Sequence, residues 1–140
     1  MINDNLALTG ALIIEKNNVV VAEVENLVVT AGKNWVADRM NNANTVMTYM
    51  ALGTGTTAAA AGNTTLVTEL DRNALTSTTV LNNTIAYAAT WAAGDATGAI
   101  TEAGIFDAAS GGDMLARTVF SVVNKGASDS ITITWTITIS

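Results

Sequence analysis

The segment ITITWTITI, residues 131–139, alternates between large apolar side chains at odd positions and threonine at even positions. Successive side chains of a β-strand point to opposite faces of a sheet, so the alternation predicts a strand with one apolar face and one threonine face. A strand of this kind would pair with other chains if it lay at an open sheet edge. We therefore expect its apolar face to line a core and neighbouring strands to cover its edges, within the chain or across an oligomer.

Two Asn-Asn pairs each lie between segments of strand-like composition. Residues 6–15 are extended and apolar, Asn17-Asn18 follows, and apolar residues resume at Val19. A second pair, Asn82-Asn83, separates STTVL from TIAYAATW. Asparagine tolerates the left-handed backbone conformation that two-residue hairpin turns require. The sequence therefore predicts β-hairpins over residues 5–30 and residues 73–92.

One segment, TAGKNWVADRMNN at residues 30–42, has apolar residues at helical spacing. Thr30 is a candidate N-cap, and Asn41-Asn42 is a candidate stop. A helix of about three turns is too short to be stable alone. We expect it to pack on a sheet through Trp35 and Met40.

Short turns separate the other predicted strands, which lie at residues 46–52, 99–109 and 114–123. Residues 65–72 (TLVTELDR) are expected to form one helical turn with Leu66 and Leu70 directed inward. This pattern predicts an all-β fold, an antiparallel sandwich or barrel of about eight strands with one short helix near residues 31–41. We divide the chain into an N-terminal hairpin at 1–30 and a β-sandwich domain at 31–140, expected to form one compact unit.

Charged residues make up 13% of the chain, about half of their usual share, while hydrophobic residues make up 49%. The remaining surface must consist of threonine, asparagine, serine, glycine and alanine, which lose water at low cost when they contact another protein. The net charge is −6, and the six lysines and arginines are scattered along the sequence. The composition therefore predicts an assembly subunit that does not bind nucleic acid.

The sequence contains few residues that could form a catalytic site or bind a cofactor. Histidine and cysteine are absent, which excludes the common nucleophilic triads and zinc sites. The stretch GTGTTAAAAG (53–62) lacks the ending of a phosphate-binding loop, so we interpret it as a flexible surface loop. We expect Asp95, Glu102 and Asp107 to be solvated turn residues. The expectation is a protein without enzymatic activity, metal or cofactor.

Membrane association is not expected either, because no apolar run approaches the length of a transmembrane helix and the first residues do not resemble a signal peptide. Trp35, Trp91 and Trp135 each fall on the apolar side of a predicted element. Core packing explains them better than sugar stacking does.

Two sets of residues are candidates for contacts between chains. The N-terminal hairpin is apolar on both faces, which fits either a core strand or an arm lying against a neighbouring subunit, and both readings stay open. The threonine face of residues 131–139 is uncharged and β-branched. The candidate interface residues are Leu12, Ile14, Val19, Val21, Thr132, Thr134 and Thr136.

Three segments resemble virion structural proteins of tailed bacteriophages: NLVVTAGKNWVADRM (26–40), YMALGTGTTAAAAGNTTLVTELDR (49–72) and ITEAGIFDAASGGDMLARTVF (100–120). The order of these segments and the spacing between them also resemble those in the phage proteins. The resemblance implies a non-enzymatic, β-rich virion protein that forms a homotrimer and contacts the major capsid protein or other virion proteins. It implies a location on the outer capsid surface or the tail after synthesis in the host cytoplasm.

The resemblance alone does not distinguish a capsid protein from a tail protein. Tail fibres continue into long repeats or a receptor-binding tip, whereas this chain ends at Ser140. We therefore expect a capsid cement (decoration) protein that clamps neighbouring capsid subunits. A tail, collar or fibre component is the first alternative, and a carbohydrate-binding module is the second.

Overall fold

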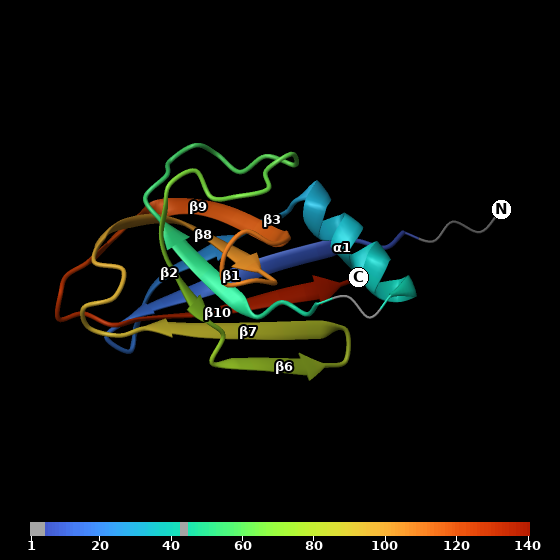
Figure 1. Ribbon diagram of the computed structural model, residues 1–140. Coiled ribbons are helices and arrows are strands. Elements are labelled where there is room, and N and C mark those ends of the chain that lie inside the picture. The colour runs from blue at the N-terminus through green and yellow to red at the C-terminus, as the bar shows by residue number, and fades with distance from the viewer. Residues whose placement is uncertain (1–4, 43–44) are drawn as a thin grey trace.

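The computed structural model describes residues 5–42 and 45–140, which form two antiparallel five-stranded sheets packed face to face (Figure 1). Sheet A has the order β2 (Val19–Glu25), β1 (Leu8–Lys16), β10 (Ile131–Ile139), β7 (Thr84–Trp91), β6 (Ser77–Leu81). Sheet B has the order β3 (Leu27–Val28), β9 (Met114–Lys125), β8 (Gly98–Phe106), β4 (Tyr49–Gly53), β5 (Glu69–Ala74). With one helix, α1 (Thr30–Asn41), the predicted all-β sandwich is confirmed, although the described residues form ten strands rather than about eight.

The alternating segment forms β10, the central strand of sheet A. It pairs with β1 on one side, from Lys16↔Ile131 to Leu8↔Ile139, and with β7 on the other. Ile133 and Trp135 are 0% exposed and lie in the core. Both edges of this strand are therefore covered within the chain, and its apolar face lines the core as predicted.

Both Asn-Asn hairpins are confirmed. Asn17, Asn18 and Asn82 have φ angles of 51°, 66° and 52°, the left-handed conformation that the turns require. Because β1 lies between β2 and β10, the N-terminal hairpin is part of sheet A rather than a separate arm. Residues 1–4 of the predicted unit 1–30 lie outside the described residues.

The main core lies between the two sheets and takes large side chains from both. Trp91 and Trp135 come from sheet A, and Ile100 and Ile105 come from sheet B, each at most 1% exposed. The Trp135 indole nitrogen donates a hydrogen bond to Asn26 Oδ1 at 3.0 Å, which satisfies its polar end inside the core. This continuous core joins the two sheets into one unit.

Helix α1 packs on β9 through its first turn, and Trp35 and Val36 of its predicted stripe pack against the main core as partly buried residues. Gly32 is buried, and a side chain there would collide with the Leu115 carbonyl group, so the helix backbone approaches the sheet closely. The prediction that Met40 packs on the sheet is wrong, because its side chain is 86% exposed. Thr30 is also not the N-cap, since Val29 occupies that position and has no side-chain capping bond.

The predicted helical turn at residues 65–72 is wrong as well. Residues from Glu69 onward form β5, which pairs with β4. Leu66 is buried as expected, but Leu70 is 41% exposed. Within the described residues, α1 is too short and too polar to qualify as a membrane-spanning helix.

Candidate functional site

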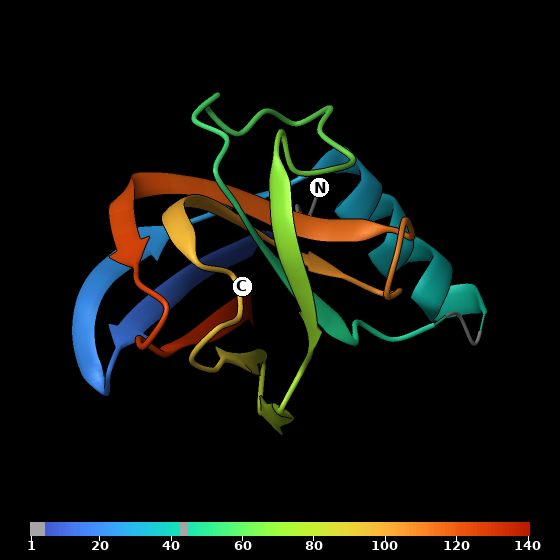
Figure 2. The ribbon, with the colours of Figure 1, turned by 60° about the vertical axis from the view of Figure 1, so that its left-hand side comes forward.

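The outer face of sheet B is covered by the chain itself. Figures 1 and 2 show the segment 54–68 and helix α1 lying over β8 and β9. A small second core forms beneath this cover. It consists of Val29, Ala51, Leu66, Phe106 and Met114, each at most 5% exposed. Sheet B therefore has its own layer on the side that faces away from sheet A.

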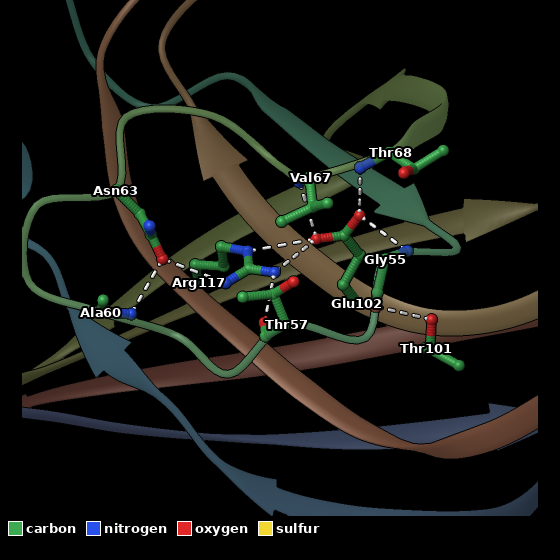
Figure 3. Close-up of polar contacts among 9 residues, drawn as sticks. All are labelled: Gly55, Thr57, Ala60, Asn63, Val67, Thr68, Thr101, Glu102 and Arg117. Carbon is green, nitrogen blue, oxygen red and sulfur yellow. Dashed lines mark hydrogen bonds and ion pairs between the residues drawn. The ribbon is translucent and has the colours of Figure 1, made fainter.

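A buried ion pair between β8 and β9 holds the segment 54–68 in place (Figure 3). Arg117 donates to Glu102 Oε2 through Nη2 at 2.8 Å and through Nε at 3.1 Å. The backbone amides of Gly55 (3.0 Å) and Thr68 (2.7 Å) donate to Glu102 Oε1, and the amide of Val67 donates to Oε2 at 3.0 Å. The Glu102 carboxylate therefore binds both ends of the segment 54–68.

The other half of the ion pair anchors the middle of the segment. Arg117 Nη2 donates to the Thr57 carbonyl oxygen at 2.9 Å, and Nη1 donates to Asn63 Oδ1 at 3.0 Å. The Asn63 side chain in turn accepts a hydrogen bond from the Ala60 amide at 2.8 Å. The guanidinium thus bridges sheet B to a stretch that has no strand or helix of its own (Figure 3).

The environment of Glu102 favours its ionised form. Burial raises the pKa of this carboxyl, but the hydrogen bonds from the Thr68 amide, from Arg117 and from the amides of Val67 and Gly55 outweigh burial. The net result is a pKa below the ordinary value of 4.5. A carboxylate saturated by donors has no free lone pair directed at a substrate, so this arrangement suits a structural clamp.

One prediction about this region is wrong and another is incomplete. Residue type predicts Glu102 to be solvated in a turn, but it lies in β8 and is 0% exposed. The stretch 53–62 is largely an exposed loop, as predicted, but hydrogen bonds at Gly55 and Thr57 join it to the clamp. A sequence signal was available, because Glu102 and Arg117 are single charges within two apolar strand-like segments. The structure adds that Arg117 pairs with Gly104, two residues from Glu102 on the same face.

The turn between Asp107 and Asp113 is closed by its own hydrogen bonds. The Asp107 carboxylate accepts a hydrogen bond from the Asp113 amide at 2.7 Å, which closes the turn around Gly111 and Gly112. Among residues 5–42 and 45–140, no group of three or more side chains of the metal-binding types comes together.

The outer face of sheet A has no comparable cover. No helix or loop of the described chain crosses this face in Figures 1 and 2. The residues that the strand register places on it from β1 through β6 are, except for Glu15 and Leu81, small or β-branched, and Glu15 is the one charged residue among them. They are Thr9, Ala11, Ile13, Glu15, Thr132, Thr134, Thr136, Thr138, Thr84, Ala86, Ala88, Thr90, Ser77, Thr79 and Leu81.

Acidic residues lie along one margin of this face. Glu23 and Glu25 of β2 share the face with Glu15 of β1, because Glu23 pairs with Ile13 and Glu25 with Ala11. No lysine or arginine of sheet A takes a position on this face in the described register. The face therefore has a broad uncharged area with an acidic border at the β2 side.

The predicted interface residues divide into two groups. Leu12 and Ile14 are wrong as interface residues, because they are at most 1% exposed and lie in the core between the sheets. Val19 and Val21 on β2 are 64% and 46% exposed.

The three threonines, Thr132, Thr134 and Thr136, lie side by side on the uncovered face of sheet A. Thr134 is exposed, whereas Thr132 is half-buried, and its hydroxyl group lies 3.0 Å from that of Thr90. These residues and the two valines are accessible to a partner, and their role in binding stays a prediction.

All three tryptophans lie in the core or pack against it, as predicted. Trp91 and Trp135 are 0% exposed, so neither ring can stack on a sugar. Trp35 is half-buried on α1, and its indole nitrogen donates to the Thr45 carbonyl oxygen at 2.8 Å.

Comparisons with known proteins give no relative for this chain: no family model, no curated protein and no solved structure matches it.

Proposed function

We propose that this chain is a non-enzymatic structural protein of a tailed-bacteriophage virion, a cement protein that binds to the capsid through the outer face of sheet A. The observation that carries the proposal is the difference between the two sheets. The chain covers the outer face of sheet B with its own residues, whereas the outer face of sheet A has no cover and almost no charge.

The chemistry of the uncovered face favours contact with protein. Threonine, alanine and isoleucine side chains carry no charge that burial would remove from water, and the threonine hydroxyls can hydrogen-bond to a partner. Their β-branched or short side chains also leave little conformational entropy to lose. Charged side chains, which are depleted at the centre of protein interfaces, occur only toward its β2 margin. A partner surface with an uncharged centre and basic residues facing Glu23 and Glu25 would match it.

The size of the face is sufficient for a specific contact. Nine residues of β10 at about 3.3 Å each extend for roughly 30 Å, and five strands about 4.8 Å apart extend for roughly 24 Å. Because β2, β7 and β6 have only seven, eight and five residues, the resulting area is about 600 Å², roughly three quarters of the ~800 Å² that each partner contributes to a standard protein interface. Many copies on one shell would then act together through avidity.

The clamp in sheet B supports a role that requires rigidity. The segments that resemble phage virion proteins contain Gly55, Glu102 and Arg117, the residues that fix the cover of sheet B. Their contacts have a structural explanation that involves no substrate. Under this proposal they keep the face opposite the shell ordered.

The proposal is tested by binding of purified protein to phage particles that lack it. Thr134→Lys places a charge at the centre of the uncovered face, where binding would remove it from water, and we expect at least a tenfold loss of affinity. Thr56→Lys is the matched control, because Thr56 is an exposed threonine in the cover of sheet B. The control should bind as the unchanged protein does.

Equal binding of the two variants would contradict the proposed face, and absence of the chain from virions would contradict the proposed function. Copy number distinguishes the main alternative, because shell symmetry predicts hundreds of copies per particle, on the order of the capsid subunit count, whereas tail symmetry predicts tens.

A further inference from the structure

The four edge strands of the two sheets differ in how they are protected against pairing with another chain. β3 has only two residues, β2 contains Glu23 and Glu25 and lies beside a register shift at Ile14/Glu15, and β5 contains Glu69, Asp71 and Arg72. Short length, irregularity and charge are the devices that proteins use to block edge-to-edge association. Three of the four edges in the described chain therefore have such a device.

The fourth edge, β6, has none of them. Its five residues, STTVL, include no charge and no proline, and all five are exposed. Val80 and Leu81 are each 67% exposed. β6 is hydrogen-bonded to β7 on one side, and no strand of the described chain lies on its other side.

The hairpin turn determines which backbone groups face the open side. A two-residue loop, Asn82-Asn83, makes Leu81 and Thr84 the hydrogen-bonded pair that closes the turn, and such pairs alternate along an antiparallel ladder. Leu81, Thr79 and Ser77 therefore direct their N–H and C=O groups toward β7. Thr78 and Val80 direct theirs toward the open edge, where a further strand can bind them.

We propose that β6 pairs with β6 of a second copy of this chain, antiparallel and around a two-fold axis at Thr79, so that two sheets A join into one continuous sheet. In this register Thr78 lies opposite Val80 of the second copy, and Val80 lies opposite its Thr78. Both members of each pair have outward backbone groups, so each pair can exchange both hydrogen bonds. The register uses the whole strand from Ser77 to Leu81.

Charge favours a second copy over an unrelated partner at this edge. The chain has a net charge of −6, so two copies repel each other in most orientations. Between Arg72 and Asp95, however, the sequence has no charged residue, and β6 lies in the middle of this interval. Approach through β6 therefore brings no acidic residue of this strand into the contact, and Arg39 of α1, which lines a pocket together with Thr78 and Val80, would repel a basic partner.

The consequence is a two-fold pair rather than the trimer that the phage resemblance implies. Five residues a side form a small contact, which is typical of weak or transient association. The joined sheets would present one uncharged threonine–alanine surface of twice the width. The inference concerns the outward backbone groups of β6, and its tests use the free protein without phage particles, so their outcome does not depend on the proposed function.

Disulfide trapping tests the pairing and its register. The chain has no cysteine, so Thr79→Cys introduces a single thiol. In the proposed pair the two Thr79 residues face each other at a position that is not hydrogen-bonded, with Cα atoms about 4.5 Å apart, a separation that a disulfide can bridge. Under mild oxidation with oxidised glutathione, we expect Thr79→Cys to form a covalent dimer.

Ser77→Cys is the matched control on the same strand and the same exposed face. Its two copies would lie four residues apart along the strands, about 13 Å, which a disulfide cannot bridge. We expect Thr79→Cys to cross-link at least tenfold faster than Ser77→Cys, and equal rates in denaturant. Equal rates in the folded protein, or no cross-linking of Thr79→Cys, would overturn the proposal.

A charge swap gives a second, independent measurement. Sedimentation equilibrium of the unchanged protein should show its mass rising with concentration from 14.4 kDa toward that of a dimer. Thr79→Lys and Thr79→Glu should each remain monomeric, because like charges would face each other, while their mixture should dimerise again. A trimer, or dimerisation that these variants leave unchanged, would contradict the inference.

Discussion

Replacement of Glu102 by glutamine removes the charge of the clamp while keeping its shape. The carboxylate accepts hydrogen bonds from three backbone amides and two Arg117 nitrogens. If the amide oxygen of the glutamine takes the place of Oε1, its NH₂ group faces Val67 and Arg117, which are also donors. Glu102→Gln therefore leaves buried donors unsatisfied and the Arg117 charge without its partner.

The expected loss is large on the scale of protein stability. Removal of one partner of a buried ion pair costs about 3–5 kcal/mol, and the total stability of a domain is about 5–15 kcal/mol. Arg117→Met should cost less, because Glu102 would keep its three backbone donors. We expect the free energy of unfolding, measured by denaturant titration with tryptophan fluorescence, to fall in the order unchanged protein, Arg117→Met, Glu102→Gln.

Lys16→Met is the control, because the ion pair of Lys16 with Asp129, at 3.6 Å, is partly exposed on both sides and should contribute little to stability. A protease specific for small residues adds a local readout. It should cut the AAAA run at 58–61 faster in Glu102→Gln than in the unchanged protein. A loss below about 1 kcal/mol for Glu102→Gln, with unchanged proteolysis, would refute the clamp.

Two further predictions concern the same framework. Because the folded pKa of Glu102 is lowered, its stabilising contribution is complete above the ordinary pKa of 4.5 and is lost as the pH falls through the folded pKa. Denaturant titrations from about pH 5 to pH 3 should therefore show falling stability, with a weaker dependence in Glu102→Gln, and equal dependence would count against this. Gly32→Ala should lower the melting temperature because its new methyl group meets the Leu115 carbonyl, whereas Gly62→Ala, in open space, should not; equal effects would contradict the close packing of α1 on β9.

The elements that could be predicted from the sequence are those determined by local chemistry. The alternation in residues 131–139 indicates β10 and its core face, because a period of two has no other structural explanation. Asn17-Asn18 and Asn82-Asn83 indicate two hairpins, because few residues tolerate left-handed backbone angles. These patterns depend on neighbouring residues alone.

The errors arise where contacts distant in sequence decide the structure. Leu66 and Leu70 have helical spacing, but the Glu102 carboxylate holds the amides of Val67 and Thr68, and β4 pairs with the residues that follow. Glu102 itself is more than thirty residues away from those amides in sequence, and its residue type alone predicts exposure to solvent. Hydrophobic character likewise could not distinguish Leu12, which is buried in the core, from Val19, which is exposed at the sheet edge.

The outer face of sheet A could likewise be predicted only in part from the sequence, because it depends on contacts that are distant in sequence. The threonines of β10 could be assigned to one face from the sequence, but only the strand order shows that β1, β7 and β6 extend this face with further uncharged residues. The sequence also does not show that the segment 54–68 covers sheet B rather than sheet A. The difference between the two outer faces is a property of the tertiary structure.

A three-dimensional image of the virion that resolves this protein tests the central claim most directly. The account predicts that the protein lies on the capsid with the outer face of sheet A, centred on Thr134, against the shell, and with the segment 54–68 directed away from it. A protein seated on the shell through the segment 54–68 and α1, with the threonine face in solvent, would contradict the account.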